Sequence, residues 1–155
     1  MQLFMKSLKI NLLIWLMLLG CIPFGMSQRT ENYRSPQYEF NTAMELFQKE
    51  KFGPAQQYFK YVYEHTGDKQ QDLKTNSYFY MGVCAAKLDN QDAGYLLQNF
   101  IDRYPVHSYV NEAHYYLGRF YFTRKQYKKV ITQFDFIYEN EIQPENIAEY
   151  QFKKG

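Results

Sequence analysis

The sequence predicts an all-α protein built as a row of antiparallel helix hairpins, and two observations support this fold class. Apolar residues recur at helical spacing from Val110 to Tyr138, in two segments separated by the short break Thr123 to Gln126. Such a short break makes the second helix run back along the first, which gives a helical hairpin. The same pattern recurs upstream at steps of 36 to 38 residues, a spacing typical of a helical-repeat array.

The repeat is carried by small and aromatic positions and not by charge. Steps of 38 and then 37 residues align Ala55 with Ala93 and Val130, and Phe59 with Leu97 and Phe134. Gly82 and Gly118 are separated by 36 residues. One hairpin cannot bury its apolar stripe alone, so we expect neighbouring hairpins to stack into an α-solenoid.

The first 27 residues have the pattern of a secretory signal peptide. Lys6 and Lys9 precede an uninterrupted apolar run, Leu12 to Leu19, and small residues follow up to Ser27. This order is typical of an export signal. We therefore expect cleavage after Ser27 and a periplasmic or outer-membrane-associated protein. Residues 28–35 are polar and without periodicity, which predicts a flexible lead-in.

Two other interpretations of the amino terminus stay open. A permanent membrane anchor needs about 20 apolar residues, whereas Asn11 and Pro23 bracket a shorter run. The sequence Leu18-Leu19-Gly20-Cys21 resembles the lipobox of bacterial lipoproteins, in which Cys21 would carry the lipid. Membrane association of the mature protein is expected only in that second case.

The net positive charge of the chain comes from its leader. Two of the 18 basic residues lie in the leader, so the remaining 128 residues carry 16 basic and 16 acidic side chains. An overall charge balance of this kind gives no reason to expect binding to nucleic acid.

Capping and turn residues place the first hairpin in residues 36–67. Its first helix is expected from Pro36 to Glu50, because proline suits the first helical position. Gly53-Pro54 predicts the turn, and the second helix should then run to about Glu64. Gly67 would end that helix in the left-handed conformation.

The second hairpin is expected in residues 68–107. Asp68 and Gln71 have the spacing of a capping box at the start of its first helix. Leu88-Asp89-Asn90 predicts the turn between the helices. The second helix should stop before Tyr104-Pro105, since the residue ahead of proline disfavours helical geometry.

The third hairpin is expected in residues 108–144, with Ser108 as the cap of its first helix and a second helix that fades near Asn140. A further helical start follows Pro144, so residues 145–155 read as part of a fourth hairpin. Nothing in this segment resembles the polar capping helix that usually ends a solenoid. We therefore expect a truncated chain from a protein with more repeats.

The residues of the third repeat resemble the tetratricopeptide repeat. Leu117-Gly118, Tyr121, Tyr127 and Phe134 stand where that family has its Leu-Gly pair and its aromatic positions, while Val130 replaces the packing alanine. The other repeats fill corresponding places with Ala43, Leu46, Phe52, Ala55 and Phe59 in the first, and with Gly82, Ala93, Leu97 and Pro105 in the second. The resemblance implies the right-handed solenoid of residues 36–155.

Long repeats, a leader and many tyrosines are similar to secreted tetratricopeptide proteins of the bacterial envelope. Those include outer-membrane-assembly lipoproteins and Tol-Pal-associated coordinators, and the overall character suggests a Bacteroidetes-like source. By analogy with the family's groove, the partner-binding positions would be Phe40, Met44, Phe47, Asn76, Phe79, Val83, Lys87, Glu112, Tyr115, Arg119 and Phe122. Alternatively, Phe40, Phe79 and Phe122 only fill the seams between repeats.

Signals for catalysis and for cofactors are weak. Cys84 is left without a disulfide partner and lies in an apolar helical stretch, where a cysteine behaves as a small hydrophobic residue. The histidines His65, His107 and His114 have no zinc spacing, and no glycine-rich phosphate loop is present. We expect no enzyme activity, no cofactor, no metal and no small-molecule substrate.

A basic run, Arg124, Lys125, Lys128 and Lys129, encloses Tyr127. Such a run is most often a solvated face, and the alternative is binding of phosphate or anionic lipid.

The expected function is a non-enzymatic scaffold of the cell envelope that binds a peptide or a partner's helix in the groove of the first helices. The alternative is an accessory domain of a larger envelope enzyme or sensor.

Overall fold

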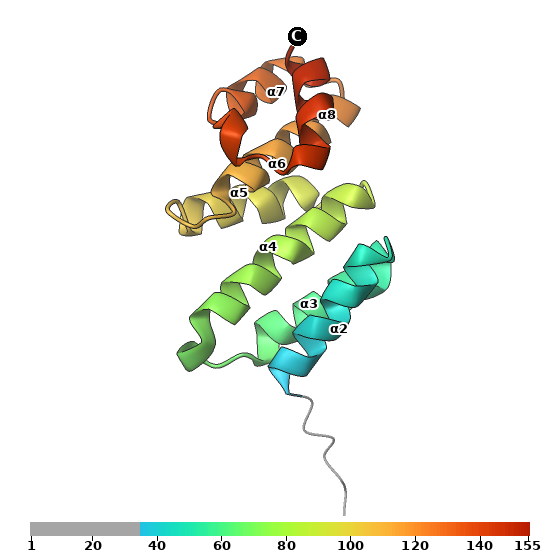
Figure 1. The fold of residues 1–155 in the computed structure, drawn as a ribbon, viewed down its shortest axis with the longest axis vertical. Helices are drawn as coiled ribbons and strands as arrows, with labels where there is room; N and C mark the ends of the chain where they lie inside the picture. The colour runs from blue at the N-terminus through green and yellow to red at the C-terminus, as the bar shows by residue number, and fades with distance from the viewer. Residues whose placement is uncertain (1–34) are drawn as a thin grey trace, which may run out of the picture. The chain divides into compact units, whose positions relative to one another are not determined.

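The computed structural model describes residues 35–155, which form seven α-helices and two short 3-10 helices and contain no strand (Figure 1). The all-α fold class is therefore confirmed. The predicted signal peptide, residues 1–27, the lipobox cysteine Cys21 and all of the lead-in but Ser35 lie outside the described residues. The helices are α2 (Pro36–Gln48), α3 (Phe52–His65), η1 (Asp68–Gln70), α4 (Gln71–Lys87), α5 (Ala93–Arg103), α6 (Val110–Thr123), α7 (Tyr127–Phe134), η2 (Glu139–Glu141) and α8 (Pro144–Lys154).

Each helix packs against its neighbours in the sequence within the compact unit Arg34–Gly155. The pairs α2 with α3, α4 with α5, and α6 with α7 correspond to the three predicted hairpins, and α3 with α4 and α5 with α6 join one hairpin to the next. The first helices also contact one another in order, α2 with α4, α4 with α6, and α6 with α8. Figure 1 shows the hairpins following one another from α2 to α8.

The three hairpin turns share one backbone conformation. Glu50, Asp89 and Lys125 have φ angles of 56°, 57° and 57°, which lie in the left-handed region that residues other than glycine rarely adopt. In each turn the next residue donates its N–H to a carbonyl five residues back, with distances of 2.9 Å, 2.9 Å and 3.0 Å. This is the pattern of a Schellman motif, which satisfies carbonyl groups at a helix end.

The first turn lies earlier than expected. Helix α3 begins at Phe52, so Gly53-Pro54 belongs to its first turn. Proline is tolerated there because the backbone N–H that it lacks would have no partner within the helix. Nor does Gly67 adopt the left-handed conformation, because its φ is −74°. Helix α3 ends at His65, and the Thr66 hydroxyl donates to the Val62 carbonyl at 2.6 Å.

Three expected helix starts lack their predicted cap. Ser35 precedes Pro36 but makes no side-chain capping bond. Asp68 begins a 3-10 turn instead of a capping box, and α4 starts only at Gln71. Helix α6 starts at Val110 and not beside Ser108, and a turn precedes it in which the Val110 N–H donates to the His107 carbonyl at 2.9 Å and the Tyr109 N–H to His107 Nδ1 at 3.2 Å.

Helix α7 ends at Phe134, so the expectation that it extends to about Asn140 was wrong. The chain turns there because the Asn111 side chain binds the backbone of Tyr138, donating to its carbonyl at 3.0 Å and accepting from its N–H at 2.7 Å. The turn also buries Ile137 and Ile142 against the core. These long-range contacts outweigh the helical spacing of the sequence.

Small residues let the two helices of a hairpin approach closely, as predicted. A Cβ added at Gly82 would lie 3.1 Å from Leu97 of α5, and one at Gly118 would overlap the ring of Phe134 of α7. Ala93 is completely buried at the start of α5. Among the described residues no helix combines the length and hydropathy needed to cross a membrane.

Candidate interaction surface

The first helices α2, α4, α6 and α8 carry the eleven residues that were predicted to line a groove, together with new polar partners from α8. Seven of the eleven are partly exposed, and they are Phe40, Met44, Phe47, Asn76, Lys87, Arg119 and Phe122. Four are buried, with exposed fractions of 2% for Phe79, 1% for Val83, 4% for Glu112 and 0% for Tyr115. The side chains of those four contact the protein interior, so a partner would meet only the other seven.

The aromatic rings in this set fill seams between hairpins. Phe79 of α4 stacks on Tyr109 ahead of α6, with ring centroids 4.5 Å apart. Phe40 of α2 contacts Phe59 of α3 at 5.6 Å and Tyr80 of α4 at 6.3 Å in edge-on arrangements. Stacked and edge-on arrangements are the geometries that pairs of aromatic rings prefer. The seam-filling role is thus observed for Phe79, while Phe40 combines a seam contact with partial exposure.

Lys87 is the half-buried cation of this surface. Its ammonium group lies 5.8 Å from the ring centroid of Phe52 on α3 and 5.5 Å from that of Tyr116 on α6. Burial, with the nearby positive charge of Arg119, lowers the pKa of Lys87. No carboxylate of a described residue lies within ion-pair distance of it. The two ring faces are the groups that its ammonium contacts directly, while the charges of Glu149, Glu50 and Glu112 act on it from farther away.

Arg119, in contrast, is already paired. Its Nε lies 2.9 Å from Glu149 Oε1 of α8, and the same carboxylate accepts hydrogen bonds from Lys153 and, at 3.0 Å, from the hydroxyl of Tyr115. Burial raises the pKa of Glu149, but the contacts of Lys153 and Arg119 outweigh it, so the net shift is downward. A partner's carboxylate would have to compete with Glu149 for Arg119.

Glu112 is a buried carboxylate between α6 and α8. Its Oε1 accepts a hydrogen bond of 2.7 Å from Asn146 Nδ2, while Oε2 has no hydrogen-bond partner. Burial raises the pKa of Glu112, because the charged form loses its hydration. Glu112 therefore acts as a polar contact that holds α8 and not as a free binding group.

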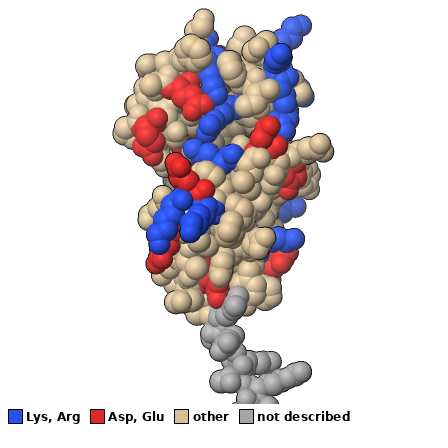
Figure 2. Space-filling view, turned by 90° about the vertical axis from the view of Figure 1, so that its right-hand side faces the viewer, with Lys and Arg blue, Asp and Glu red and all other residues tan. Residues whose placement is uncertain are grey.

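The polar partners Asn146 and Glu149 were not predicted, because the sequence of α8 indicates only the start of another hairpin. In both contact pairs, Glu112 with Asn146 and Tyr115 with Glu149, the two residues are 34 positions apart in the sequence. That spacing would have predicted them, since first helices of adjacent repeats lie side by side. On the face drawn in Figure 2, basic and acidic side chains lie close together in the central and upper parts.

The described residues contain no group of three histidine, cysteine or acidic side chains that could hold a metal. Cys84 is completely buried, and burial raises the pKa of its thiol to about 12, which keeps it protonated and unreactive.

Comparison of this chain with protein-family models, with curated proteins and with solved structures finds no match.

Proposed function

We propose that this protein is an exported, non-enzymatic scaffold whose helix hairpins form a right-handed, tetratricopeptide-like solenoid. The support is the order of helix contacts, in which successive first helices touch, and the recurrence of one turn conformation at Glu50, Asp89 and Lys125. Repeated units of this kind present one continuous face to a partner.

The partner is a protein segment with an acidic group, held on the face of the first helices. The observation that carries this proposal is Lys87, a half-buried cation between two aromatic rings without a carboxylate partner among the described residues. A carboxylate of the partner would pair with the ammonium group of Lys87. Hydrogen bonds between charged groups are stronger than those between neutral groups, most of all where water is partly excluded. The same partner could also meet the polar side chain of Asn76, which lies on the same helix as Lys87. Partly exposed aromatic side chains on the neighbouring first helices are Phe47 and Phe122.

Photo-crosslinking tests this surface. A photoreactive residue placed at Asn76 on α4 should give protein adducts in the native envelope, whereas one at Gln57 on the exposed side of α3 should not. Lys87→Gln should reduce the Asn76 adducts about tenfold or more, since it removes a charge-assisted contact. Lys74→Gln, a change of the same chemistry on the same helix, is the control and should leave them unchanged.

Equal adducts from both positions, or equal loss with Lys87→Gln and Lys74→Gln, would contradict the proposal. Circular dichroism of each variant shows whether the helices remain intact.

A further inference from the structure

The turn before α7 and the first half of that helix concentrate positive charge. Residues 124–134 contain four basic side chains and no acidic one, although the chain after the leader is balanced overall. Arg124 is paired with Asp89 at 2.6 Å. Lys125, Lys128 and Lys129 have no carboxylate of a described residue within ion-pair distance, whereas Lys49 and Lys60 elsewhere do.

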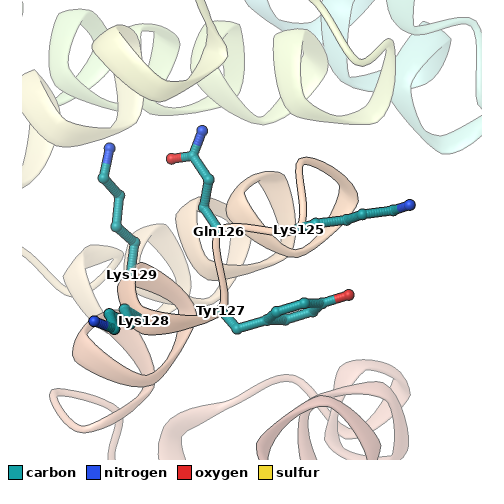
Figure 3. Close-up of a pocket in the computed structure, with 5 residues that line it drawn as sticks. All are labelled: Lys125, Gln126, Tyr127, Lys128 and Lys129. Carbon is teal, nitrogen blue, oxygen red and sulfur yellow. The ribbon is translucent and has the colours of Figure 1, made fainter.

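The three lysines diverge. In Figure 3, Lys125 and Lys128 point in opposite directions, and Lys129 points to a third side together with Gln126. These residues and Tyr127 line an open depression of about 550 Å³. Side chains that spread in this way cannot converge on one small anion, but they can reach several phosphates arranged in a plane.

Apolar side chains are exposed beside the lysines. Tyr127 is 54% and Ile131 is 58% exposed, and a spacing of four residues puts them on neighbouring turns of α7. Val130 and Phe134, at adjoining positions around the helix, are buried and anchor it in the core. A rigidly held helix that shows lysines with an aromatic and an aliphatic residue has the composition of a membrane-surface helix.

We propose that residues 125–131 form a docking surface for a bilayer that contains anionic phospholipid. The lysines would contact headgroup phosphates, while Tyr127 and Ile131 enter the headgroup layer. Each lysine near an anionic surface strengthens binding by about fivefold. An acidic protein is less well matched, because its carboxylates would need to meet three ammonium groups that point in different directions. The surface is separate from Lys87 and does not depend on the proposed groove function.

Vesicle co-sedimentation tests the proposal. The protein is purified as residues 28–155, because an apolar leader would bind lipid by itself and because residues 34–155 form a compact unit with their own core. Vesicles of phosphatidylcholine with about a third phosphatidylglycerol should bind it, and vesicles of phosphatidylcholine alone should not. Binding should fall steeply in 0.5 M NaCl, because salt screens contacts to exposed charges.

Two triple variants isolate the surface. Replacing Lys125, Lys128 and Lys129 with Gln should weaken vesicle binding on the order of a hundredfold, by the fivefold effect of each lysine. Replacing Lys49, Lys51 and Lys60 with Gln lowers the net charge equally and should leave binding within about twofold. Tyr127→Ser with Ile131→Ser should weaken it severalfold at unchanged charge. Thermal melting by circular dichroism confirms that each variant is folded.

Three outcomes would overturn the proposal: equal binding to both vesicle types, equal weakening by both lysine triples, or undiminished binding without Lys125, Lys128 and Lys129. Absence of vesicle binding, together with envelope protein adducts from a photoreactive residue at Thr132, would assign the surface to an acidic protein instead.

Discussion

Arg124 and Asp89 join the turns of the second and third hairpins. The guanidinium group donates a hydrogen bond of 2.6 Å to Asp89 Oδ1 and one of 3.3 Å to the Asp89 carbonyl, and it lies 3.6 Å from the centre of the Phe120 ring. Two hydrogen bonds and a cation–π contact thus hold one side chain between neighbouring repeats.

Arg124→Gln should destabilise the protein by about 1 kcal/mol, because the ion pair is partly exposed and its strength is limited by solvent. Urea unfolding followed by circular dichroism measures the change. Lys69→Gln, at an exposed lysine in the η1 turn, is the control and should shift the midpoint hardly at all. An Arg124→Gln variant as stable as the control would show that the joint contributes nothing.

Gly118→Ala should destabilise the protein by about 1–3 kcal/mol, since the new methyl group would overlap the Phe134 ring in a packed core. Phe134→Leu in the same chain should recover part of the loss by making room. Gly53→Ala, where a Cβ has nothing within 4 Å, should instead stabilise helix α3 slightly. Thermal unfolding compares the three, and a neutral Gly118→Ala would mean that α6 and α7 are less closely packed than described.

Glu50→Gly should raise the free energy of unfolding by about 0.5–1 kcal/mol, because glycine adopts the left-handed conformation without steric conflict. Glu50→Ala keeps a Cβ at the same backbone position and should give no such gain. Urea midpoints of both variants make the comparison. Equal stability of the two would indicate that the first turn is not held in this conformation in solution.

Glu112→Gln should change how stability depends on pH. The raised pKa of Glu112 means that the folded state holds its proton more tightly than the unfolded state does. Its stabilising effect is complete below the ordinary carboxyl pKa of 4.5 and is lost as pH rises through the higher folded value. The amide of the variant stays neutral, so the stability of the variant relative to the wild type should rise as the pH rises above 4.5. Unfolding curves across that range test the direction, and a parallel pH dependence would contradict it.

Export can be tested through tryptophan. The chain has one tryptophan, Trp15, which lies in the proposed leader. Cleavage after Ser27 should give a secreted protein without tryptophan emission and with the intact mass of residues 28–155. Retained tryptophan fluorescence in the exported protein would disprove cleavage at that site.

The sequence predicted the helices and their pairing well, because both depend on local patterns. Apolar spacing located α2 to α6 within a few residues, and the alignment of Gly82 with Gly118 identified two places of close helix approach. The end of α7 could not be predicted in this way. Ile137 continues the helical spacing, and only the distant side chain of Asn111 turns the chain away.

The candidate site was less predictable than the fold. The helical periodicity places Glu112 and Tyr115 on the first helix of a repeat but cannot say whether the next first helix covers them. Helix α8 does so through Asn146 and Glu149, and the charge of Arg119 is neutralised in the same contact. Lys87 is half-buried, and its contacts with two rings were not predicted from the sequence.

The common geometry of the turns at Glu50, Asp89 and Lys125 also bears on how such a chain can change in length. The backbone enters and leaves each of these corners along the same path. A gene recombined between two of them would join matching ends, so about forty residues could be gained or lost without redirecting the helices that follow.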